Sequence, residues 1–265
     1  MIRLIATDLD GTLLNACGRL PEGIFDIVRA LKEKGIQFAV CSGRTYGNMR
    51  RLFAPVADEM AYVCENGAMC VVDDMVSDIV PIPDGEAKEI ISDIQAEKMN
   101  LLISGRHTTY VLDENRRYTD DIVYRLRNTV TVVDDPAQVT EPILKISGQK
   151  NEGMGESAAR LGAKWAGRVT ATLASRDWFD FTCANKGIGM RSLLRRLNIA
   201  PEETAAFGDS FNDESMLDLV GYPFIMAKAA TQLKKPGFYL CENEMDVLRQ
   251  IVQGTWNPQK GKCGG

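Results

Sequence analysis

Two pairs of aspartates, far apart in the sequence, each follow an apolar segment. Asp8 and Asp10 belong to the run DLDGT, and Asp209 and Asp213 belong to the run GDSFND. Each preceding segment is typical of a buried strand, so these carboxylates are expected where ligands bind in open parallel sheets, beyond the strand ends. Four converging acids offer hard oxygen ligands, which suit Mg²⁺, whereas zinc prefers histidine or cysteine. The alternative for Asp213 is that it caps the helix that follows.

The elements that must position these acids alternate between strand and helix, which indicates a parallel sheet. In the first part of the chain we expect strands and helices, in chain order, at residues 3–7, 21–34, 36–41, 46–53, 61–64, 69–72 and 76–80. The last two of these form a predicted hairpin. After an interruption the alternation resumes at residues 186–197, 204–207, 212–219, 224–226 and 245–253.

The interruption begins at Pro81 and Pro83, where the pattern changes character. A helix at 85–97 and strands near 101–104 and 109–112 are followed by a helix, a strand, a helix and two late strands. We therefore predict a doubly wound, Rossmann-like α/β core with a parallel sheet, formed by residues 1–82 and 184–265. An inserted α+β domain at 83–183 divides this core.

The composition narrows the class of protein. The 265 residues are 45% hydrophobic and 25% charged, which is enough for a globular core and a second domain. A net charge of −5 without a long basic block argues against nucleic-acid binding. No apolar run is long enough to cross a membrane, and Asp8 and Asp10 interrupt the apolar N-terminal stretch as no signal-peptide core would allow, so a cytoplasmic protein is expected.

The cysteines and the histidine exclude several kinds of site. The seven cysteines form no CxxC pair, and we expect reduced thiols. The single histidine, His107, cannot build a multi-histidine zinc site and is expected on the surface of a turn in the insert. Carboxylates must therefore carry the chemistry.

The motifs together resemble those of the haloacid dehalogenase superfamily phosphatases, in particular the Cof-like branch (type IIB), which carries a large C2 cap. The counterparts of the four family motifs are Asp8 to Leu13 (DLDGTL), Ser42 with Gly43 and Arg44, Lys186 within NKG, and Gly208 to Asp213 (GDSFND). DxDGT combined with GDxxND is a specific signal, while SGR or NKG alone is weak. Asp10 is typical of the phosphatases and absent from true dehalogenases, so dehalogenation is disfavoured.

The resemblance implies a role for each matched residue. Asp8 is the expected nucleophile, and Asp10 the general acid that protonates the leaving group and then activates water. Binding of Mg²⁺ is assigned to Asp8, Asp209, Asp213 and the backbone carbonyl of Asp10. Asp213 is expected to orient the ligands or water molecules of the metal. Phosphate or substrate binding is assigned to Leu9 and Gly43 through backbone N–H groups, and to Ser42, Lys186 and Asn212.

Three weaker signals leave alternatives open. The segment 65–67 (ENG) resembles a part of Cof-like proteins that faces the cap, but turn chemistry explains it equally well. Arg44 either contacts substrate or pairs with a local acid. Lys186 without the other motifs would be a solvated lysine at a helix start.

The expected activity is Mg²⁺-dependent hydrolysis of a small phosphomonoester, with sugar phosphates as the first choice and the insert as the cap that sets specificity. The expected partner is this small phosphorylated substrate, with neither nucleic acid nor membrane. One alternative is phosphoryl transfer of the phosphosugar mutase type. Another is a non-catalytic regulator that binds a phosphometabolite on the same fold, against which stands the presence of every expected catalytic residue.

Overall fold

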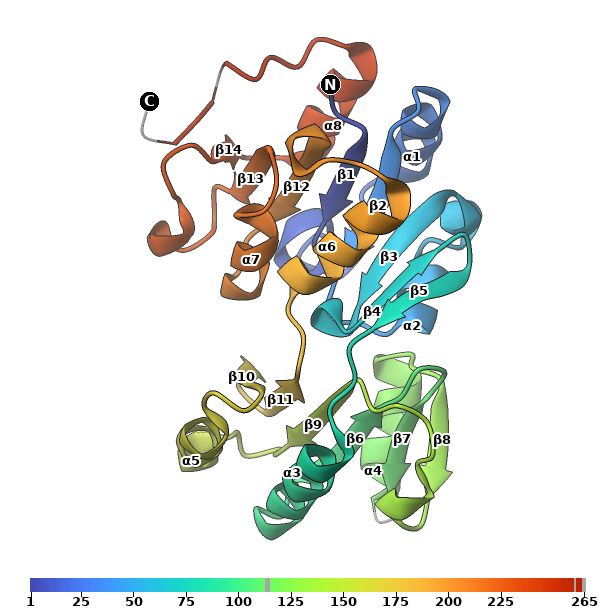
Figure 1. The fold of residues 1–265 in the computed structure, drawn as a ribbon, viewed down its shortest axis with the longest axis vertical. Coiled ribbons are helices and arrows are strands. Elements are labelled where there is room, and N and C mark those ends of the chain that lie inside the picture. Colours follow the sequence, from blue (N-terminus) through green and yellow to red (C-terminus); the bar gives the residue numbers. More distant parts are fainter. Residues whose placement is uncertain (113–114, 260, 264–265) are drawn as a thin grey trace. The chain divides into compact units, whose positions relative to one another are not determined.

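The structure is a computed structural model that describes residues 1–112, 115–259 and 261–263. It divides into two compact units, residues 1–78 with 185–265 and residues 79–184, whose elements are labelled in Figure 1. The first unit is an α/β core and the second an α+β insert, so the predicted fold class is confirmed. That the insert is a cap that sets substrate specificity stays a prediction.

The core is built on an eight-stranded sheet in the order β14-β13-β12-β1-β2-β3-β4-β5. Its strands are β1 (Leu4–Thr7), β2 (Gln37–Cys41), β3 (Met60–Cys64), β4 (Met69–Val72), β5 (Met75–Ile79), β12 (Thr204–Gly208), β13 (Tyr222–Met226) and β14 (Tyr239–Cys241). From β14 to β3 all neighbours are parallel, while β4 runs antiparallel to β3. The strands of the parallel part are almost fully buried, as expected for a sheet covered by helices on both faces.

The core helices are α1 (Ile24–Glu33), α2 (Tyr46–Leu52), α6 (Lys186–Leu197), α7 (Glu214–Leu217) and α8 (Glu244–Gln253). Leu4 and Ala6 of β1 belong to one buried cluster with Met190 of α6. Because successive side chains of a strand alternate between faces, Thr7 is directed to the opposite face, where α1 packs on β2 and on α8. The core is therefore doubly wound.

Strand β1 lies between β12 and β2 and runs parallel to both, with Thr7 level with Phe207 and Val40. The carboxyl ends of the three strands therefore meet at one edge of the sheet. The chain continues from β1 to β2 on one side, while β12 arrives from the other half of the core, so this edge is a topological switch point. The residues that follow these strands are Asp8, Ser42 and Asp209.

The insert contains a six-stranded sheet in the order β10-β11-β9-β6-β7-β8. Its strands are β6 (Asn100–Ser104), β7 (Thr109–Leu112), β8 (Val130–Val133), β9 (Lys145–Gln149), β10 (Thr170–Ser175) and β11 (Trp178–Thr182), and its helices are α3 (Asp84–Ala96), α4 (Arg116–Asp120) and α5 (Gly155–Trp165). Ile94 of α3 and Trp165 of α5 pack in one cluster with Ile146 and Phe181 of the sheet. The insert thus has a hydrophobic core of its own.

The sequence analysis was wrong about one strand of the insert. It expected a single strand between the second and third helices, whereas the structure has two, β8 and β9. Strand β9 has the sequence KISGQ, which lacks the apolar alternation on which strand prediction depends. It is nevertheless central and buried because its polar side chains find partners, as when the Ser147 hydroxyl donates to Asp180 at 2.7 Å.

Other sequence features lie outside the site. His107 is exposed between β6 and β7, and its backbone N–H donates to Glu141 at 3.0 Å. All seven cysteines are free thiols. Among the described residues, no helix has the length and apolar character needed to cross a membrane.

Candidate active site

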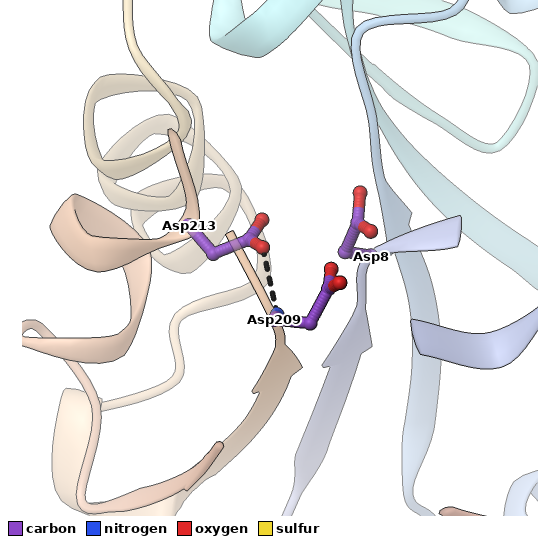
Figure 2. A group of neighbouring side chains, drawn as sticks. All are labelled: Asp8, Asp209 and Asp213. Atoms are coloured by element: carbon purple, nitrogen blue, oxygen red, sulfur yellow. Dashed lines mark hydrogen bonds between the residues drawn. The ribbon is translucent and has the colours of Figure 1, made fainter. Parts of the chain in front are cut away.

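Three aspartates gather at the switch point of the core sheet (Figure 2). Asp8 follows β1, while Asp209 and Asp213 follow β12, and one carboxylate oxygen of each lies within 4.8 Å of the others. Asp8 and Asp213 are buried and Asp209 is partly buried. Such a set of oxygen atoms without histidine or cysteine fits Mg²⁺ in the chemistry of its donors.

Lys186 is the positive charge inside this cluster. Asn185 caps α6 by accepting a hydrogen bond from the backbone N–H of Ile188 at 2.9 Å, so Lys186 is the first residue of the helix. Its side chain is fully buried, and its Nζ lies 2.6 Å from Asp8 Oδ1 and 2.5 Å from Asp213 Oδ1. A lysine in this position is not a solvated residue at a helix start.

Burial and charge act against each other in this pair. Burial alone would lower the pKa of Lys186, but the carboxylates of Asp8 and Asp213 outweigh it and raise that pKa above its ordinary value. Burial also raises the pKa of Asp8 to about 7, against the attraction of Lys186. The cluster thus contains three carboxylates and one ammonium, so its formal charge is negative unless a further cation binds.

Both oxygens of the Asp213 carboxylate have partners in the core. Oδ1 accepts from Lys186, and Oδ2 accepts from the backbone N–H groups of Asp209 at 3.0 Å and Ser210 at 2.9 Å. Asp213 therefore holds the loop that carries Asp209 and also orients Lys186. The role of Asp213 in acting on the surroundings of a metal and its assignment as a ligand both stay predictions.

Asp209 reaches the cluster because Gly11 leaves room for it. A Cβ atom on Gly11 would lie 2.3 Å from Asp209 Oδ2, and Gly11 has a φ of +93°, which favours glycine. The hydroxyl of Thr12 donates to Asp209 Oδ1 at 3.2 Å. Burial raises the pKa of Asp209, and the nearby Asp213 carboxylate raises it further.

The structure brings Asp10 to a different environment from Asp8. The Asp10 side chain is 59% exposed and lies outside the group of three carboxylates. Arg44 binds it with two hydrogen bonds, from Nε to Oδ2 at 2.8 Å and from Nη2 to Oδ1 at 2.6 Å. Of the two alternatives for Arg44, the described residues place it against a local acid, and that acid is the predicted proton shuttle.

The remaining predicted residues follow the ends of β1, β2 and β12. Leu9 and Ser42 are buried, so Leu9 can act only through its backbone. The Ser42 carbonyl accepts from the backbone N–H of Asn66 at 3.0 Å, and a Cβ atom on Gly43 would lie 3.1 Å from the Asn66 amide. Asn212 is exposed and donates to Asn66 Oδ1 at 3.3 Å. Asn66 thus connects the predicted phosphate-binding residues of both halves of the core.

Sequence reasoning missed two residues of this region and left a third undecided. Thr12 lies inside the recognised DLDGT run, so its position near Asp209 could have been inferred from that motif. Asn66 was noted, but without its link to Asn212. Glu244, which binds Thr7 on the far side of Asp8, belongs to no motif, and no signal in the sequence marks it.

Comparisons with known proteins cover nearly the full chain. A profile of haloacid dehalogenase-like hydrolases matches residues 5–246. The chain is 26% identical over 264 residues to phosphatase YwpJ of Bacillus subtilis (strain 168), covering 88% of this chain and 92% of that protein. It is 22% identical over 267 residues to the 5-amino-6-(5-phospho-D-ribitylamino)uracil phosphatase YbjI of Escherichia coli (strain K12), covering 95% and 97%.

A solved structure extends the comparison to the fold. The haloacid dehalogenase subclass IIB sugar phosphatase BT4131 matches with a TM-score of 0.77 and 20% identity, over 96% of this chain and 100% of that chain. At this identity the likeness concerns the fold alone. All of these matches include the insert as well as both halves of the core.

Proposed function

The chain belongs to the family of haloacid dehalogenase-like hydrolases, and from this premise we propose that it hydrolyses a small phosphomonoester through an aspartyl phosphate on Asp8. The observation that carries the proposal is the position of Asp8. Its carboxylate is buried at the switch point, 2.6 Å from the Lys186 ammonium and beside Asp209. A buried carboxylate that contacts an ammonium, with further acids beside it to hold a metal ion, is suited to attack an anionic phosphate.

The donor set supports Mg²⁺ as the cofactor. Asp8, Asp209 and the backbone carbonyl of Asp10 would hold the ion, and Asp213 would orient its surroundings. When bound, Mg²⁺ would neutralise charge on the transferring phosphoryl group. Lys186 supplies a second positive charge from the protein itself, and the backbone N–H groups of Leu9 and Gly43, with Ser42, would bind phosphoryl oxygens.

The two aspartates of DLDGT divide the chemistry. A carboxylate oxygen of Asp8 forms a bond to phosphorus while the bond from phosphorus to the ester oxygen breaks, and protonated Asp10 gives its proton to that leaving oxygen. Water then attacks the phosphorus of the aspartyl phosphate while the bond from phosphorus to the Asp8 oxygen breaks, which regenerates the Asp8 carboxylate, and Asp10 takes a proton of the water as inorganic phosphate leaves. Asp10 thereby regains the proton that it lost.

The substrate class is a small phosphorylated metabolite, with sugar phosphates as the first choice. Two observations support this proposal. The named relatives are phosphatases, and the name of one gives a phosphorylated ribityl compound as its substrate. The fold is similar to that of a sugar phosphatase. The insert would act as the cap that selects among such substrates. A panel of phosphorylated metabolites, tested with the whole chain, would identify the preferred one.

The test of the mechanism uses an aryl phosphate, whose leaving group needs little protonation. Asp8→Asn should form no phosphoenzyme and lose nearly all activity. Asp10→Asn should still phosphorylate Asp8 but dephosphorylate slowly, giving a burst and a steady-state rate lower by about 10²–10⁴-fold. Asp26→Asn, at an exposed aspartate of α1, is the matched control and should behave as wild type.

Rapid-quench kinetics and intact-mass analysis separate the outcomes. A phosphorylated Asp8→Asn protein, or an Asp10→Asn protein with wild-type turnover, would overturn the division of labour. Chelation of the metal should abolish turnover, and Mg²⁺ should restore it. Restoration by zinc with none by Mg²⁺ would overturn the assignment of the ion.

A further inference from the structure

A buried acid lies behind the nucleophile, on the face of the sheet that α8 covers. Asn243 caps α8 by accepting from the backbone N–H of Met245 at 2.9 Å, so Glu244 is the first residue of the helix. Both Glu244 and Thr7 are buried. The Thr7 hydroxyl lies 2.9 Å from Glu244 Oε2 and 2.8 Å from the backbone carbonyl oxygen of Asp8.

These two contacts fix the direction of the hydrogen bonds. A threonine hydroxyl has one hydrogen, and a carbonyl oxygen can only accept. With Glu244 ionised, the Thr7 hydroxyl would share its one hydrogen between two acceptors. Each contact can be a full hydrogen bond only if Thr7 donates to the Asp8 carbonyl and Glu244 donates to Thr7. This second arrangement requires a proton on Glu244.

The surroundings of Glu244 agree with a protonated acid. Its second oxygen, Oε1, is buried and has no hydrogen-bond partner among the described residues, a position that would be costly for an ionised carboxylate. Burial raises the pKa of Glu244 to about 8, and the negative charge of Asp8 adds to the shift. A hydrogen bond donated by Thr7 to an ionised Glu244 would oppose that shift without outweighing burial. Geometry and burial thus favour the same form.

We propose that neutral Glu244 is a positioning residue, which acts through Thr7 to hold the peptide unit between Asp8 and Leu9. In a planar trans peptide the C=O and N–H groups point in opposite directions, so fixing the Asp8 carbonyl also fixes the Leu9 N–H. That N–H hydrogen-bonds the Asp8 carboxylate and lowers its pKa. It is also a predicted donor to the phosphoryl group, so the inference rests on the proposed function.

The test compares variants that keep the hydrogen bonds with variants that remove them. Glu244→Gln keeps a neutral donor of the same size, and Thr7→Ser keeps the hydroxyl. Glu244→Leu and Thr7→Val remove the donors at similar volume. With an aryl phosphate and Mg²⁺, the first two should keep kcat within about 3-fold, while the last two should lower kcat by about 10–100-fold with little change in KM. Glu242→Leu, at an exposed neighbour, is the control.

A disruptive variant that does not fold would also lose activity, so its fold must be measured separately. Far-UV circular dichroism and thermal unfolding identify variants that do not fold. Wild-type kcat in Thr7→Val, or equal losses in Glu244→Gln and Glu244→Leu, would overturn the proposal.

A second measurement needs no activity. In protein labelled with ¹³C at the glutamate carboxyl, the resonance that disappears in Glu244→Gln should have the chemical shift of a protonated acid at about pH 6, above the ordinary pKa of glutamate. A shift typical of a carboxylate at that pH would overturn the proposal. If the wild-type protein hydrolyses no phosphomonoester, the proposed function fails, and this measurement still decides the state of Glu244.

Discussion

Removing the buried ammonium of Lys186 is the most informative single change, because the structure gives it two carboxylate partners and no solvent. In Lys186→Met the side chain keeps a similar length and loses its charge. The cluster of three carboxylates and one ammonium then changes its formal charge from −2 to −3. Asp8 and Asp213 lose the group that binds both of them, and their mutual repulsion is no longer balanced.

The magnitude follows from the two contacts of 2.6 and 2.5 Å. Opposite charges about 4 Å apart attract by about 4 kcal/mol at an effective dielectric constant of about 20, and these are closer. Burying the lysine costs free energy, which offsets much of that attraction. Removing one partner of a buried ion pair typically costs about 3–5 kcal/mol, because the other partners stay buried without compensation. We expect that loss in the free energy of unfolding without metal.

The assay is urea unfolding of wild type and Lys186→Met at neutral pH, first in chelator and then in excess Mg²⁺. The ion supplies the missing positive charge to the folded state, so it should stabilise the variant more than the wild type. Turnover of the variant should remain lower by about 10²–10³-fold even with Mg²⁺, because the protein's own charge on the phosphoryl group is absent. Lys88→Met, at an exposed lysine of α3, is the control and should match wild type.

Two results would refute this reasoning. If the variant unfolds at the same urea concentration as wild type in chelator, Lys186 does not compensate the buried acids. If Mg²⁺ stabilises both proteins equally, the ion and the ammonium do not share one cluster of charge.

Three further predictions concern the surroundings of the site and the insert. Gly11→Ala should weaken Mg²⁺ binding and lower kcat, because its Cβ would meet Asp209 Oδ2 at 2.3 Å, and titration by calorimetry would measure this. Arg44→Gln removes the two hydrogen bonds that orient Asp10, and steady-state kinetics should show a smaller loss of kcat than for Asp10→Asn. Glu97 has a pKa lowered to about 2 by hydrogen bonds from its arginine, serine and lysine partners, so Glu97→Gln should lose about 1 kcal/mol of stability near neutral pH. Since a lowered pKa stabilises the fold above the ordinary value of 4.5, that difference should vanish as the pH falls towards 2 in urea unfolding.

Much of the core was predictable because its signals are local and repeat along the chain. Short apolar segments followed by acids or by small residues mark the carboxyl ends of parallel strands. Once β1, β2 and β12 are recognised as neighbours, Asp8, Ser42 and Asp209 must lie at one edge. The family resemblance derived from these motifs is confirmed by the profile match over residues 5–246.

The parts that were not predictable depend on tertiary partners. Strand β9 is polar in sequence and is stabilised by pairing with β6 and β11, which no local pattern reveals. The sequence left open whether Arg44 contacts substrate or a local acid. Only the folded position of the loop after β2 shows that its partner is Asp10. Glu244 is one of many acids in a helical first turn, and its importance appears only when α8 packs behind Thr7.

The surroundings of Asp8 and Asp10 differ in a way that suits the two different roles proposed for them. Asp8 is buried and held twice, through its carboxylate by Lys186 and through its backbone carbonyl by Thr7. A nucleophile must attack along one line, so fixed geometry favours it. The Asp10 side chain is exposed, and its carboxylate is bound by Arg44, whose side chain is itself partly exposed. A proton shuttle must meet first a leaving group and then a water molecule, and an exposed side chain with a separable partner can serve both.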